Sequence, residues 1–186
     1  MSPEIWSAIF AGATFIVIAA TAIAALIQLR HLRASNQLNT LLTLMRMWQA
    51  ADLQEHMGYV RGELQQKMRD PNFIAAFGER SLSRNEHREL LVADYWEQIG
   101  AFMKYNLMDE ESWIDVAGAQ VYYAWQSLRP IIKAMRNLRG PSAYENFEFA
   151  AVRAKLWLDK HPDGFYPSRT PRMEQLETVA ETQAPQ

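Results

Sequence analysis

Cysteine is absent from this sequence, and the opposite charges nearly cancel, with 19 Lys and Arg against 21 Asp and Glu. Without cysteine the chain forms no disulfide bond and no zinc site with thiolate ligands, which agrees with a cytoplasmic location for the folded part. A formal net charge of -2 gives no strong electrostatic attraction to nucleic acid. We therefore expect neither a disulfide-rich domain nor a nucleic-acid-binding protein.

Charged side chains are also missing from the whole stretch between Ile5 and Leu29. As an α-helix this stretch is about 37 Å long at about 1.5 Å per residue, whereas the hydrocarbon core of a bilayer is about 30 Å thick. Arg30, His31 and Arg33 follow directly, and no Lys or Arg precedes the stretch. Basic residues stay on the cytoplasmic side of a membrane. We predict a single-pass anchor in the inner membrane, with the N-terminus outside and the C-terminal domain in the cytoplasm.

A cleaved signal peptide is the alternative interpretation, because Ala22 and Ala24 each complete a pattern of small residues that fits a cleavage site. We favour the anchor, since the positive charge that usually precedes the apolar part of a signal peptide is missing. Small residues four apart, such as Ala8 and Gly12, would also let a second copy of the helix approach closely, although such pairs are common in single spans.

The pattern after the anchor predicts that the first helix continues into the polar part of the chain. No Gly or Pro separates Arg30 from Leu38, and apolar residues then recur at helical spacing. We expect one helix over about 3–50; the alternative is two helices joined at Ser35-Asn36, where a bend is easiest. The apolar stripe of its second half consists of Leu38, Leu41, Leu42, Met45 and Trp48.

Helical spacing and capping residues also predict the other elements, and no segment has the pattern of a strand. Asp109 caps the helix expected over about 109–139, and Pro130 should kink or break that helix. Ser142 with Glu145 forms a capping box at the start of the helix expected over about 142–160. The fold class is therefore all-α, with one N-terminal transmembrane helix that continues into a small antiparallel helical bundle. The expected helices cover about 52–68, 71–77, 86–106, 109–139 and 142–160.

These elements divide the chain into an anchor at 1–29, a cytoplasmic helical domain at 30–160 and a tail at 161–186. The tail has few apolar residues and several prolines, so we expect it to be mostly disordered, with a transient helix near 172–182.

Motifs of known chemistry are missing from the sequence. It has no nucleophile elbow, no phosphate-binding loop and no dinucleotide fingerprint, and none of its 4 histidines has a metal-binding spacing. We therefore name no catalytic residue, no cofactor and no metal ligand, and the sequence does not indicate an enzyme.

Two groups of residues are the best candidates for a site. Trp48, Tyr122 and Trp125 form a candidate interaction surface, although an aromatic stripe at helical spacing is more often core. The second group is polar: buried carboxylates with shifted pKa values would form a site, but we favour internal ion pairs that hold helices in register. This candidate polar cluster consists of Asp94, Glu97, Arg129, Glu145, Glu148 and Arg153.

Several short segments of the chain form a distinctive combination. They are L-N-T-L-L-T-L-M-R-M-W (38–48), Y-W-E-Q-I-G (95–100), K-Y-N-L-M-D-E (104–110), A-W-Q-S-L-R-P (124–130) and Y-E-N-F-E-F (144–149). This combination resembles the uncharacterised bacterial family called domain of unknown function 4760, from the anchor to about Lys160. The resemblance implies a small bacterial protein with an N-terminal hydrophobic segment and a helical body, and it implies no activity and no cofactor.

Two hypotheses of function follow from these observations. The first is a membrane-tethered interaction module or scaffold, which holds a protein partner or a second copy of itself at the inner membrane. The second is a small-ligand-binding protein or an enzyme that uses the candidate polar cluster between helices. A deep charged pocket containing Glu97 and Glu145 would favour the second hypothesis, and a solid core at that place would remove its basis.

Overall fold

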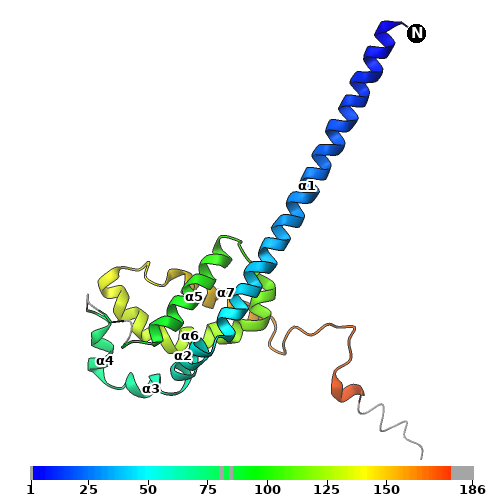
Figure 1. Cartoon of the computed structure of the whole chain (residues 1–186). Coiled ribbons are helices and arrows are strands. Elements are labelled where there is room, and N and C mark those ends of the chain that lie inside the picture. Colours follow the sequence, from blue (N-terminus) through cyan, green and yellow to red (C-terminus); the bar gives the residue numbers. More distant parts are fainter. Residues whose placement is uncertain (1, 80–81, 84–85, 177–186) are drawn as a thin grey trace, which may run out of the picture.

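The computed structural model describes residues 2–79, 82–83 and 86–176, and these ranges contain helices and no strand. The predicted all-α fold is confirmed, and the first helix ends within one residue of the expected position. Figure 1 shows a long helix leaving a body that the other helices form. The helices are α1 (Pro3–Gln49), α2 (Ala51–Gly62), α3 (Leu64–Lys67), α4 (Pro71–Ala76), α5 (Glu89–Lys104), α6 (Glu110–Arg139) and α7 (Glu145–Lys160).

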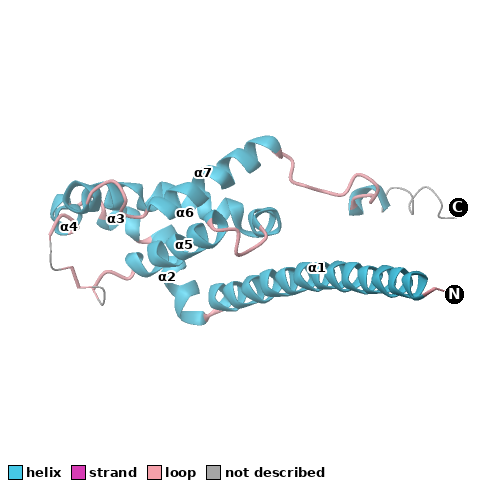
Figure 2. Cartoon of the chain, turned by 90° about the horizontal axis from the view of Figure 1, so that it is seen from above, coloured by secondary structure: helices cyan, strands magenta, loops and turns pink. Residues whose placement is uncertain are grey.

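The helix α1 is one continuous rod whose apolar half stands clear of the rest of the chain (Figures 1 and 2). Its most hydrophobic stretch contains no buried residue, and the side chains of Phe10 and Phe15 are 66% and 71% exposed. Water does not favour an exposed apolar surface of this extent. The helix is therefore long and apolar enough to cross a membrane, a property that it shares with signal sequences near an N-terminus.

Only the C-terminal part of α1 packs on the body. Leu44 is 2% exposed, and its carbonyl oxygen accepts a hydrogen bond of 3.1 Å from the Tyr95 hydroxyl of α5. The ring of Trp48 lies 5.8 Å from that of Trp113 and 6.5 Å from that of Trp96. Burial raises the pKa of Tyr95, because its ionised form would lose hydration. The hydroxyl therefore stays protonated, and its bond to α1 persists, above the pH of about 10 at which an exposed tyrosine ionises.

The body is built around α5, α6 and α7, with α2 packed on α5 and α6. The helices α5 and α7 approach each other closely at Gly100 of α5, where an added Cβ atom would be 1.9 Å from the carbonyl oxygen of Asn146 in α7. Large side chains fill the centre; Trp96, Trp113 and Phe147 are all 0% exposed. The core is thus solid between these helices.

Of the kink or break expected at Pro130, the break does not occur, because α6 continues through the proline as one helix of 30 residues. Proline removes the hydrogen bond to the carbonyl four residues earlier, which belongs to Gln126. Both residues are exposed, so water can satisfy that carbonyl, while Leu128 and Ile131 on either side of the proline are buried. Packing on both sides therefore keeps the helix intact. At its start, Asp109 accepts a bond of 3.1 Å from the backbone N–H of Ser112, which confirms the predicted cap.

The tail leaves the body after α7 (Figure 1). Phe165 packs edge to face on His161, with ring centroids 5.0 Å apart, and the described residues beyond His161 are exposed. A single helical turn occupies 173–176. The rest of the predicted tail, 177–186, lies outside the described residues.

Candidate functional site

The structure does not gather the candidate polar cluster into one site. Arg129 is exposed and forms no ion pair with any described residue. Asp94 and Glu97 lie one turn apart on α5 and face the start of α7. The other members pair with residues outside the predicted set: Glu145 with Lys104 at 3.0 Å, Glu148 with Arg136 at 2.7 Å, and Arg153 with Glu110 at 2.5 Å.

The carboxylate of Glu97 caps α7 from the neighbouring helix. Its two oxygens accept bonds of 2.8 Å from the side-chain amide of Asn146 and from the backbone N–H of Phe147. The predicted capping box at Ser142 is wrong, because the residue before α7 is Tyr144 in a left-handed conformation (φ 56°, ψ 36°) with no side-chain cap bond. The free N–H groups at a helix start attract a negative charge, and Glu97 supplies that charge in place of a local cap.

Side chains of α5 and α6 also hold the turn before α7 in place. The guanidinium of Arg136 donates bonds of 2.8 Å to the Ala143 carbonyl and 3.3 Å to the Tyr144 carbonyl, and it also pairs with Glu148. The Tyr144 hydroxyl donates a bond of 2.9 Å to Asp94. These contacts connect α7 to α5 and α6. They give the residues of the predicted cluster that take part in them a structural role, in line with the favoured interpretation that polar pairs hold neighbouring helices in register.

We expect Glu97→Ala to lower the free energy of unfolding by about 1–3 kcal/mol, because it removes a charged acceptor from two donors at the α7 start. Glu97→Gln keeps an acceptor oxygen and should cost less than half as much. Thermal unfolding of the detergent-solubilised chain, followed by circular dichroism, measures both. Equal losses for Ala and Gln, or no loss for either, would contradict the capping role.

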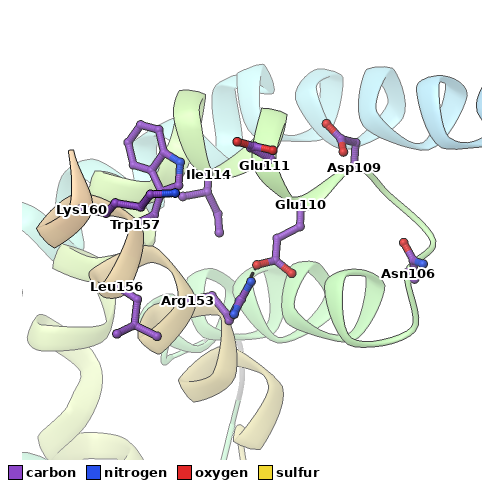
Figure 3. A pocket seen from close by; sticks show the side chains of 9 residues that line it. All are labelled: Asn106, Asp109, Glu110, Glu111, Ile114, Arg153, Leu156, Trp157 and Lys160. Atoms are coloured by element: carbon purple, nitrogen blue, oxygen red, sulfur yellow. Dashed lines mark hydrogen bonds and ion pairs between the residues drawn. The ribbon is translucent and has the colours of Figure 1, made fainter. Parts of the chain in front are cut away.

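A charged pocket of about 480 Å³ opens between the start of α6 and the end of α7 (Figure 3). Arg153 and Glu110 form an ion pair in its lining, and Lys160 lies beside the ring of Trp157. Asp109 also lines the pocket, but it already caps α6. Opposite charges therefore offset one another here, and the lining contains no histidine, serine or threonine that would make a nucleophile-base pair.

An apolar groove of about 440 Å³ lies where the end of α1 meets α2, α5 and α6. Tyr123 stands at this groove with 63% of its surface exposed, whereas Trp96 is fully buried beneath it. Tryptophan, tyrosine and arginine are the residues most often found at the energetic centres of protein interfaces. We call this feature the Trp48 groove; its lining includes Trp48, Met57, Arg61, Trp96, Gln120 and Tyr123.

Of the candidate interaction surface, only Trp48 lines this groove. Tyr122 is half-buried on another side of α6, where the Lys155 ammonium lies 6.0 Å from its ring centroid. Trp125 is 9% exposed and packs edge to face on Phe147 at 5.2 Å. Tyr123 was not among the three residues of the candidate surface. It lies two positions from both Val121 and Trp125, which are buried, so helical spacing could have placed it on the outward face.

Comparison with protein-family models matches residues 15–153 to Domain of unknown function (DUF4760). The matched region covers well over half of the chain. The chain belongs to this family. A search of curated proteins found no match, and a search of solved structures found none either.

The DUF4760 match joins the apolar half of α1 to the body in one unit. It begins at Phe15, inside the apolar stretch, and ends at Arg153 in the middle of α7. The cap at Glu97, the Trp48 groove and the close contact at Gly100 all lie within it. The tail lies outside it, so the family assignment rests on residues 15–153, from the apolar stretch of α1 to the middle of α7.

One further polar contact in this DUF4760 chain escaped the sequence reasoning. Glu89, in the first turn of α5, is 0% exposed, and its carboxylate lies 2.8 Å from Nδ1 of His87. The rings of Phe73 and Phe77 cover the histidine at 5.9 Å and 4.6 Å. Glu89 also helps to raise the pKa of Tyr59 to about 12, after burial as the larger cause. Among the described residues no group of three potential ligands could hold a metal ion.

Proposed function

We propose that the chain is a single-span protein of a bacterial inner membrane that presents a helical interaction module on the cytoplasmic side. In this proposal residues 1–29 are the anchor, 30–160 the module and 161–186 the tail, with the N-terminus outside. The observation that carries the proposal is the continuity of α1, which runs without interruption from the apolar stretch to the core at Leu44. A domain that is only tethered needs no such rigid connection, whereas a module that must face a membrane neighbour does.

The arrangement of charge supports the orientation. Arg30, His31 and Arg33 follow the apolar stretch on α1 and are exposed, and no described residue before it is basic. Basic residues are retained on the cytoplasmic side during insertion. The body, which begins after these residues, is therefore on the cytoplasmic side in our proposal.

The Trp48 groove is the surface that we assign to a protein partner. It combines an apolar interior with the exposed ring of Tyr123 and the guanidinium of Arg61 at its edge. The polar alternative, a ligand or an enzyme site at the candidate polar cluster, loses support, since Glu97 and Glu145 are engaged in the cap and ion pair at the α7 start.

The proposal predicts a partner contact that depends on the rigid connection. A photo-crosslinking amino acid at Gln120, in the groove, should give one discrete crosslinked species in intact membranes. The same amino acid at Val152, which is 52% exposed on α7, should give none. Insertion of four Gly-Ser residues after Ser35 should abolish the Gln120 product, because it releases the body from its fixed position.

The membrane topology of the chain is tested separately. A C-terminal reporter that works only in the cytoplasm should be active, and the intact mass of the purified protein should include the first residues. Processing after Ala22 or Ala24, or a reporter active only outside, would overturn the anchor. Equal crosslinking at Gln120 and Val152, or a Gln120 product that survives the insertion, would refute the rigid module.

A further inference from the structure

The turn between α5 and α6 presents apolar side chains at one end of the body. Tyr105 is 67% exposed and Leu107 is 49% exposed, whereas the next residue, Met108, is 1% exposed and holds the turn in the core. Asn106 has a left-handed conformation (φ 55°), and the N–H of Leu107 donates a bond of 2.9 Å to the Phe102 carbonyl. The two apolar side chains are therefore held outward by a well-defined backbone.

This turn is also the part of the body next to the apolar half of α1. The side-chain amide of Gln37 on α1 lies 3.5 Å from the carbonyl oxygen of Asn106. In Figure 1 the turn above α5 reaches upward beside α1, toward the apolar half, while α4 lies at the opposite end of the body. The turn therefore lies at the level of Gln37 along the axis of α1.

The distance from the membrane follows from helix geometry. Gln37 is eight residues beyond Leu29, which is about 12 Å along the axis. The headgroup layer on each side of a bilayer is about 5–8 Å thick, and the apolar stretch exceeds the hydrocarbon core by about 7 Å, which favours a tilted helix. The body lies to one side of α1 (Figure 2), so a tilt toward that side brings the turn to the headgroups.

We propose that Tyr105 and Leu107 contact the headgroup region of the bilayer that α1 crosses, and so form a second membrane contact that fixes the tilt of the body. The proposal rests on the proposed function, since it needs α1 to span. Tyrosine is enriched at the membrane-water interface, because its ring is apolar and its hydroxyl is polar. Nearby charges are mixed: Lys104 pairs with Glu145, and Asp109 and Glu111 follow the turn. The contact is therefore chiefly apolar and should depend little on anionic lipid.

The test uses the absence of cysteine, which makes every single-Cys variant of the full chain uniquely labelled. The same fluorophore is attached at Leu107→Cys, at Ala75→Cys on the exposed side of α4, and at Phe15→Cys inside the apolar stretch. The variants are reconstituted in phosphatidylcholine vesicles, with and without phosphatidylglycerol. Quenching by headgroup-labelled lipid and by a water-soluble quencher gives the depth of each label.

We expect lipid quenching at position 107 to exceed that at position 75 several-fold, with little change when phosphatidylglycerol is added. Adding Tyr105→Ser should reduce the quenching at position 107. Equal exposure of positions 107 and 75 to the water-soluble quencher, with position 15 deep in the bilayer, overturns this inference and leaves the proposed span intact. A water-exposed label at position 15 overturns both.

Discussion

Gly100→Ala is expected to give the largest loss of stability of any Gly→Ala substitution in this chain. The new Cβ would lie 1.9 Å from the carbonyl oxygen of Asn146 and 2.4 Å from its carbonyl carbon, far inside van der Waals contact. Both atoms are backbone, so no side-chain rotation relieves the clash, and α5 and α7 must separate. Overpacking usually costs about 1–3 kcal/mol and sometimes more. We expect about 3 kcal/mol or more here, measured as a fall in the thermal unfolding midpoint in detergent.

The chain offers a matched control in Gly58→Ala. Gly58 lies in the middle of α2, and a Cβ added there meets nothing within 4 Å. Alanine is a better helix former than glycine by about 1 kcal/mol, so this variant should be slightly more stable than the native chain. Similar effects of the two substitutions would show that α5 and α7 do not approach each other closely at Gly100.

Separating α5 from α7 also breaks the hydrogen bonds by which Glu97 caps α7. Glu97 lies one turn before Gly100 on α5, and its bonds to the start of α7 require the same close approach. Gly100→Ala should therefore remove most of the effect of Glu97→Ala, and the double variant should be less destabilised than the sum. Residues that share one contact are coupled in this way, whereas distant residues are additive.

The helices could be predicted from the sequence because their signals are local. Helical spacing predicted the continuous first helix, and Asp109 caps α6 as its position indicates. The helix does not break at Pro130, because burial of Leu128 and Ile131 outweighs the local rule about proline. Tertiary packing decides such cases, and the sequence pattern alone does not reveal how strong it is.

The sequence does not predict which basic residue pairs with each carboxylate. The pairing depends on the position of the basic residue along the helix axis as well as on the helix face that it occupies. Arg129 and Arg136 are seven residues apart on α6, so they share a face at levels about 10 Å apart. Both line the same shallow pocket with Glu148, yet only Arg136 reaches the carboxylate. The left-handed turn at Tyr144 sets the level of α7, and no pattern in the sequence announces that conformation.

The second large effect is expected at the core end of the Trp48 groove. Trp96 is 0% exposed, and its ring packs on those of Tyr95 at 4.9 Å and Trp48 at 6.5 Å. Replacing a fully buried tryptophan by alanine costs about 3–5 kcal/mol, through lost burial and the cavity that remains. We therefore expect Trp96→Ala to remove a large part of the typical 5–15 kcal/mol of domain stability, and to weaken the crosslink at Gln120 in proportion to the unfolded fraction.

The substitution Trp48→Ala distinguishes an effect on stability from an effect on partner binding at the same groove. Trp48 is only half-buried, so its loss should cost about 1.5–3 kcal/mol, clearly less than the loss of Trp96. The chain should then still fold, but without the crosslink at Gln120, because the groove has lost one wall. Trp96→Phe should retain both fold and crosslink, since the Trp96 Nε1 has no hydrogen-bond partner among the described residues and the smaller ring removes that buried donor. Equal destabilisation by Trp48→Ala and Trp96→Ala, or a crosslink that persists in Trp48→Ala, would mean that the groove is ordinary core and that the partner binds elsewhere.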